Sequence, residues 1–270
     1  MHPIGDSPFP HVEIATFHAV LVISAPVNLV TFWLISQWRG RDQLMPCISR
    51  SLTTSSSLFS FVVIPIEIYL KMKIKKRYQW DLISKLLCHV QLTVYFTSVF
   101  SNVLVQLYLA VARLDHRRKR TDTPLWCILG AWVFATLVAV GQKGEQPQIE
   151  CGHPVEFASL QALVWYSLML LIVLIAVIGI LQMIVLQRPY ESSRDYRAFA
   201  ALHLLIVVVC EMMMRVVSVW IVSENIQLNV SAGEWLRLVL NAINFSQALL
   251  IPLVIWLTTP LLRQDLNRTI

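Results

Sequence analysis

Two ionisable side chains, Glu211 and Arg215, lie four residues apart in the apolar segment VVVCEMMMRVV. On a helix this spacing puts both on one face, where a carboxylate and a guanidinium can form an ion pair. Charged groups inside a bilayer are costly, usually pair within the bundle, and often line binding sites or pathways. A self-contained structural ion pair is the alternative. We therefore treat Glu211 and Arg215 as candidate pocket or switch residues.

A second cation of interest, Arg113, ends a long apolar run in YLAVARLDHRRKR and is followed by a basic block at 117–120. An arginine at a helix end often extends its head group to the lipid–water boundary. It can also contact a protein partner on that side of the membrane. Ala112 precedes it, and Asp115 comes two residues later, on a different helical face. No acidic neighbour on the same helical face is therefore expected to restrain Arg113.

Groups that could catalyse a reaction or bind a metal are few. Glu211 is the one carboxylate deep in an apolar segment, while Glu67 lies near the end of another, and His18 and His203 lack metal-ligand spacing. An intramembrane hydrolase would need paired histidines, paired carboxylates or a Ser/His arrangement. A retinal protein would need a lysine in the last apolar segment, which has none. The sequence predicts no enzymatic activity, no metal and no cofactor.

Uncharged polar side chains also interrupt the apolar segments, among them Asn28, Asn102, Asn241 and Asn244. Such groups commonly form hydrogen bonds between membrane helices and so support packing. We expect this role for most of them, and we keep Asn102 as a candidate pocket residue.

The elements that must position these residues are apolar helices. Of the 270 residues, 56% are hydrophobic and 14% are charged, whereas soluble domains carry about 25% charged residues. About 20 apolar residues cross a bilayer, and satisfying the backbone there requires helices. We predict an all-α membrane protein, a seven-transmembrane helix bundle over 14–259, with spans at 14–37, 46–70, 86–111, 124–141, 158–187, 198–222 and 234–259.

Basic residues set the predicted orientation, so the net charge of +6 does not indicate nucleic-acid binding. Lys and Arg gather after spans one, three, five and seven, which places that side in the cytoplasm. Residues 1–13 then form a short extracellular N-terminus, and 260–270 form a cytoplasmic helix or tail. The basic segment 71–77 is an external exception, explained by head-group contact or by an acidic ligand. Asn229, in Asn-Val-Ser, is a candidate external glycosylation site.

Four residues fall at related spacings in this topology. Trp80 precedes Cys88 at the start of span three, Arg113 follows Cys88 by 25 residues, and Cys151 lies in the loop before span five. This pattern resembles the rhodopsin-like (class A) G-protein-coupled receptors, and the resemblance extends along the whole chain through Asn28, Pro65, Trp132 and Pro252. It implies a Cys88–Cys151 disulfide and a short amphipathic eighth helix in TTPLLRQDLNR.

The resemblance also implies residue roles and partners. Arg113, with Leu114 and Arg117, corresponds to the surface that contacts a heterotrimeric G protein. An extracellular ligand, if there is one, would bind inside the bundle, and the lipid bilayer and a receptor homo- or hetero-oligomer are the other partners. The candidate pocket or switch residues are Trp80, Asn102, Glu211, Arg215 and Pro252.

The sequence departs from the family where the family's switch residues lie. The motif at Arg113 reads Ala-Arg-Leu instead of Asp-Arg-Tyr, and Ile251 and Ile255 replace the asparagine and tyrosine of the last span. Herpesvirus-encoded and some orphan receptors show similar losses. We expect constitutive signalling at the plasma membrane, of the host cell if the protein is viral. The alternatives are a non-signalling decoy, scavenger or heteromerising receptor and, more remotely, a small membrane transporter.

Overall fold

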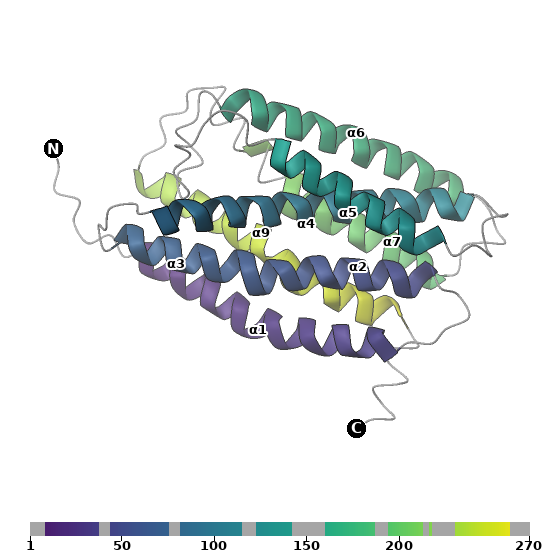
Figure 1. Cartoon of the computed structure of the whole chain (residues 1–270), viewed down its shortest axis with the longest axis horizontal. Helices are drawn as coiled ribbons and strands as arrows, with labels where there is room; N and C mark the ends of the chain where they lie inside the picture. Colours follow the sequence, from purple (N-terminus) through teal and green to yellow (C-terminus); the bar gives the residue numbers. More distant parts are fainter. Residues whose placement is uncertain are drawn as a thin grey trace.

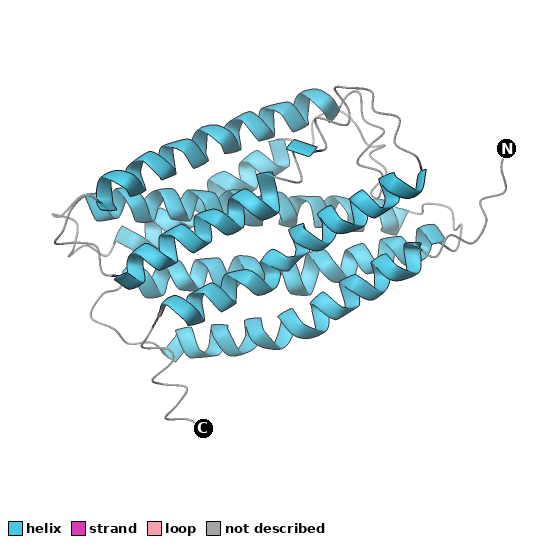
Figure 2. Cartoon of the chain, turned by 180° about the vertical axis from the view of Figure 1, so that it is seen from behind, coloured by secondary structure: helices cyan, strands magenta, loops and turns pink. Residues whose placement is uncertain are grey.

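The computed structural model describes residues 9–37, 44–75, 82–114, 123–141, 160–186, 194–212, 216–217 and 230–259. Within these ranges all regular secondary structure is helical (Figures 1 and 2). The elements are α1 (Phe9–Gln37), α2 (Leu44–Leu58), η1 (Phe59–Val63), α3 (Ile64–Lys75), α4 (Leu82–Leu114), α5 (Thr123–Gly141), α6 (Leu160–Leu186), α7 (Arg194–Val207), η3 (Val208–Met212) and α9 (Val230–Thr258).

Four helical segments in the described ranges are long and apolar enough to cross a membrane: His11–Gln37, Leu44–Met72, Leu82–Ala112 and Leu238–Thr258. Shorter apolar helices cover Trp126–Leu137, Ile172–Val185 and Ala198–Glu211. The all-helical membrane character expected from the sequence is confirmed at this level. The count of seven spans, the orientation and the eighth helix stay predictions, and residues 260–270 lie outside the described ranges.

The first helix begins at Phe9, five residues before the predicted apolar span. Pro10 is compatible with the first turn, because an N–H group there has no helical acceptor to lose. Glu13, which the sequence assigned to the N-terminal segment, therefore lies on α1, and it is buried.

The second predicted span is one helical segment that contains a π-helical turn. The elements α2, η1 and α3 follow one another without a gap, and the Ile64 N–H donates to the Phe59 carbonyl, five residues earlier. Pro65 follows at once. Its ring lacks an N–H and would clash with the carbonyl four residues before it in an ideal α-helix, so a widened turn is suited to this position.

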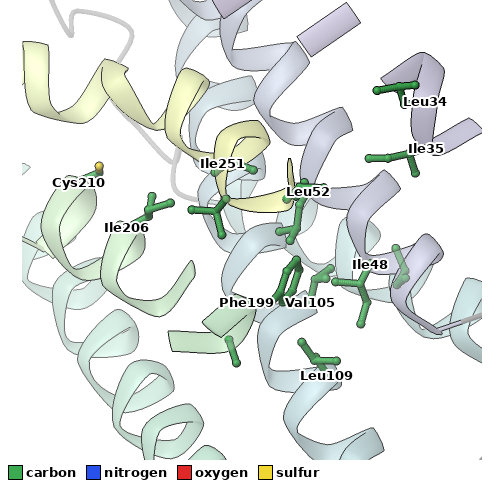
Figure 3. Close-up of a cluster of buried hydrophobic side chains, with 14 of the residues drawn as sticks. Leu34, Ile35, Ile48, Leu52, Val105, Leu109, Phe199, Ile206, Cys210 and Ile251 are labelled. Carbon is green, nitrogen blue, oxygen red and sulfur yellow. The ribbon is translucent and has the colours of Figure 1, made fainter. Parts of the chain in front are cut away.

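The helix α4 lies at the centre of the bundle and packs against α2, α3, α5, α6 and α7. Near its first turns, Cys88 packs with Leu70 of α3. Near its last turns, Leu109 joins a cluster with side chains from α1, α2, α7 and α9 (Figure 3). We refer to these two ends of the bundle as the Cys88 end and the Arg113 end.

Large apolar side chains also cover the outside of the bundle. On α6 the exposed residues include Ile172, Val173, Val177, Ile180 and Met183, and on α1 they include Val22, Leu29, Val30, Phe32 and Trp33. Apolar surface of this extent is rare on soluble monomers, whereas lipid favours it. The same helices therefore supply both the core and the surface that contacts the bilayer.

Candidate functional site

The π-helical element η3 carries a buried carboxylate into the bundle. Glu211 is 1% exposed. The Tyr95 hydroxyl of α4 donates to Glu211 Oε2 over 2.8 Å, and Gln247 Nε2 of α9 donates to Oε1 over 2.7 Å. Asn244 Nδ2 donates in turn to the Tyr95 oxygen over 3.0 Å. These four side chains form the Glu211 network, which links η3 to α4 and α9.

An aromatic group surrounds one side of this network. The Tyr95 ring lies 5.5 Å from the Phe59 ring of η1, and Phe59 lies 5.6 Å from Phe245 of α9, measured between ring centroids. Phe245 makes an edge contact with Phe17 of α1 at 4.8 Å. Both π-helical turns thus contribute a side chain next to Tyr95. Such turns often mark functional sites because they change the direction of the side chains that follow.

A second polar group surrounds the backbone carbonyl of Ala248 on α9, and the sequence explains why it forms. Pro252 lies inside α9 and has no N–H, so the carbonyl of Ala248, four residues earlier, loses its helical donor. Asn28 Nδ2 of α1 donates to that oxygen over 2.8 Å, and Ser56 Oγ of α2 donates over 2.7 Å. Neighbouring helices therefore satisfy the carbonyl that the proline leaves free, as membrane helices require.

Three charged side chains form a third group at the Cys88 end. Lys71 Nζ of α3 lies 3.1 Å from Glu13 Oε1 of α1 and 3.8 Å from Glu67 Oε1, one turn before it on α3. Lys71 is buried, although the sequence placed it in an external basic segment. It is therefore removed from the surface that an acidic ligand of segment 71–77 would use.

The structure describes some of the residues singled out by the sequence. Pro252 and Asn102 are buried, and Asn102 Oδ1 has no hydrogen-bond partner among the described residues. Cys88 is disulfide-bonded, whereas Cys47, Cys127 and Cys210 are free. Arg113 and Leu114 end α4, but their side chains lie outside the described set, as do Trp80, Arg117, Cys151, Arg215 and Asn229. The Cys88–Cys151 pairing, the Glu211–Arg215 pair and the glycosylation site stay predictions.

The polar residues expected to form interhelical hydrogen bonds do so, since Asn28, Asn241 and Asn244 all donate to side chains or carbonyls of other helices. Sequence reasoning missed Tyr95 and Gln247. A signal was available for Gln247, because Asn241, Asn244 and Gln247 recur every three residues and so mark one polar face of a helix. Tyr95 carries no such signal.

The chemistry open to these groups is binding and conformational coupling. No cluster of three or more His, Cys, Asp or Glu side chains that could hold a metal occurs in the described part of the chain. No model of a known protein family matches the chain, and no curated protein is similar enough to count as a match. The resemblance to rhodopsin-like receptors therefore depends on residue spacings in the sequence alone.

Proposed function

We propose that the chain is a seven-transmembrane receptor of the rhodopsin-like type that signals to heterotrimeric G proteins at the plasma membrane without an added ligand. The observation that carries the proposal is the course of α4, a single helix from Leu82 to Leu114. It carries the disulfide-bonded Cys88 in its second turn, contacts Glu211 through Tyr95, and carries Arg113 in its last turn. One continuous helix thus runs between the two ends of the bundle and donates a hydrogen bond to a buried carboxylate on the way.

The residues around Arg113 support activity without an added ligand. In the receptors that the chain resembles, an acid next to this arginine holds it in the inactive arrangement. Here Ala112 occupies that position and offers no charge. The sequence next to Arg113 therefore lacks the acid that restrains this arginine in those receptors, which supports signalling without an added ligand.

The Glu211 network favours the second candidate, a receptor that does not signal. Its hydrogen bonds tie η3 to both α4 and α9, and buried polar networks with satisfied partners rigidify a bundle. A receptor whose α7–η3 segment cannot move would bind a ligand or pair with another receptor without activating a G protein. Nucleotide exchange separates the two candidates directly.

The test measures GTP-analogue uptake by several purified G proteins in the presence of the full chain in lipid nanodiscs, without agonist. We expect exchange above that of empty nanodiscs, and we expect Arg113→Ala to return it to that background. Arg50→Ala is the matched control, because Arg50 is an exposed arginine near the same end whose guanidinium donates to the carbonyls of Ile35 and Ser36. Folded chain that gives no exchange with any G protein would favour the non-signalling receptor.

A further inference from the structure

The charged group at the Cys88 end consists of one ammonium held between two carboxylates inside the bundle. The Lys71 side chain is 9% exposed and that of Glu13 is 5% exposed. Ionisable groups that are buried within apolar membrane helices are rare and usually functional, and a buried ion pair alone is a weak source of stability.

Two amide side chains donate to these carboxylates, and one of them also offers an unpartnered acceptor. Asn241 Nδ2 of α9 holds Glu13 Oε1 over 3.0 Å, and Gln91 Nε2 of α4 donates to Glu67 Oε2. Gln91 is 7% exposed, yet its Oε1 has no partner among the described residues. A buried acceptor without a donor is costly, so a further N–H group beside Gln91 would relieve that cost.

An apolar layer closes this group off from the bundle interior. Phe17 lies one turn beyond Glu13 on α1, and Phe245 lies one turn beyond Asn241 on α9, with the two rings in edge contact. Both rings belong to a buried cluster with Phe59, Val63, Ile64, Ile68 and Ala248. Carboxylates above an apolar floor suit a small ligand with a charged amine and a short alkyl body.

We propose that Glu13, Glu67 and Gln91 form a binding site for a primary ammonium group, and that Lys71 is the chain's own occupant of this site. The ammonium of Lys71 bridges Glu13 and Glu67, and its four-carbon stem fills the space that the alkyl body of a free amine would take. A small primary alkylamine in its protonated form is the diffusible ligand with the same chemistry.

A tethered occupant has a consequence for signalling that depends on the proposed function. A receptor that supplies its own cation to the site needs no external ligand to hold α1, α3 and α4 in their bound arrangement. The amine site itself does not depend on coupling to a G protein. Binding can therefore be measured on the isolated chain, and a negative result in one assay leaves the other informative.

The test uses Lys71→Ala, which removes the ammonium together with the stem and leaves space for a small amine. The full chain is purified in detergent, and its Tm is followed with increasing ethylammonium or butylammonium chloride. We expect Lys71→Ala to have a lower Tm than the native chain, and millimolar amine to restore it in a saturable manner. Sodium chloride and tetramethylammonium, which has no N–H donor, are expected to restore nothing.

Two variants control for the nature of the site. Lys71→Met fills the same space without a charge, so alkylammonium ions should not raise its Tm. In Lys71→Ala/Glu13→Gln/Glu67→Gln the carboxylates are gone, and amine rescue should be lost. The proposal would be overturned if sodium chloride raised the Tm of Lys71→Ala as much as ethylammonium does. It would also be overturned if ethylammonium still raised the Tm of the triple variant, or if it did not raise the Tm of Lys71→Ala at all.

If Lys71→Ala does not accumulate as folded protein, the amine site is tested by the yield of folded chain in cells. The amount of folded Lys71→Ala chain is then compared between cells grown with ethylammonium and cells grown with the same concentration of sodium chloride. An increase with ethylammonium alone supports the amine site, and equal amounts overturn it.

Discussion

Removing the Ser56 hydroxyl tests whether Pro252 is the reason that α1 and α2 donate to α9. The Ala248 carbonyl has lost its helical donor to Pro252 and accepts from Ser56 Oγ at 2.7 Å. Pro252→Ala returns an N–H group to that carbonyl. We therefore expect Ser56→Ala to cost less free energy of unfolding in the Pro252→Ala chain than in the native chain.

The magnitude follows from the burial of the hydrogen bond. Hydrogen bonds between membrane helices contribute about 0.6 kcal/mol on average and up to about 1.7 kcal/mol. Ser56 is 1% exposed, but Asn28 Nδ2 also donates to the Ala248 carbonyl over 2.8 Å and remains after the change, so we expect the middle of that range, about 0.6 to 1.2 kcal/mol. With the helical N–H restored, the cost should fall below about 0.6 kcal/mol.

The assay is equilibrium unfolding of the purified chain in mixed micelles, followed by tryptophan fluorescence, for the single and double variants. Ser55→Ala is the matched control, because Ser55 is also 1% exposed and donates to the Ser98 carbonyl over 3.1 Å. No proline lies four residues after Ser98, so Ser55→Ala should cost the same in both backgrounds. Equal costs of Ser56→Ala with and without Pro252 would refute the reasoning.

Two further predictions concern the Glu211 network and the disulfide. Tyr95→Phe removes the hydroxyl bonded to Glu211 and should lower the free energy of unfolding by about 1 to 2 kcal/mol. Thr93→Val, which removes a hydroxyl bonded only within α4, should cost less, and equal costs measured by the same unfolding assay would argue against the network. Cys88→Ser should lower that free energy by about 2 to 4 kcal/mol, while Cys127→Ser, at a free cysteine, should not. A reductant should lower the Tm of the native chain but not that of Cys88→Ser, and an unchanged native Tm would contradict this prediction.

Helix positions were largely predictable, because apolar length decides which segments a bilayer can hold. The span predicted at 86–111 corresponds to α4, Leu82–Leu114, and the span at 14–37 corresponds to α1, Phe9–Gln37. These two helices are both longer than predicted, and α1 continues past the apolar run where polar side chains find partners. Glu13 is an example, because its bonds to Lys71 and Asn241 allow it to lie inside the bundle.

The candidate site was predictable only in part. The sequence indicated that Glu211 and Asn244 would need polar partners, and it predicted an ion pair with Arg215 for Glu211 and hydrogen bonds between helices for Asn244. It did not identify Tyr95 as the shared partner, because Tyr95 and Glu211 are 116 residues apart in sequence. It also placed Lys71 with a basic surface, since a row of cations in sequence gives no information about which of them points inward.

The sequence alone determined that this chain is helical and suited to a membrane, because backbone groups in lipid must be satisfied locally and long apolar runs satisfy them as helices. It also determined that the Ala248 carbonyl would lack a helical hydrogen-bond donor, because Pro252 follows it by four residues. Only the tertiary structure decided which residues donate the missing hydrogen bonds. Asn28 reaches Ala248 across 220 positions of sequence, and such a pairing exists because packing brings α1, α2 and α9 together, which no local pattern specifies.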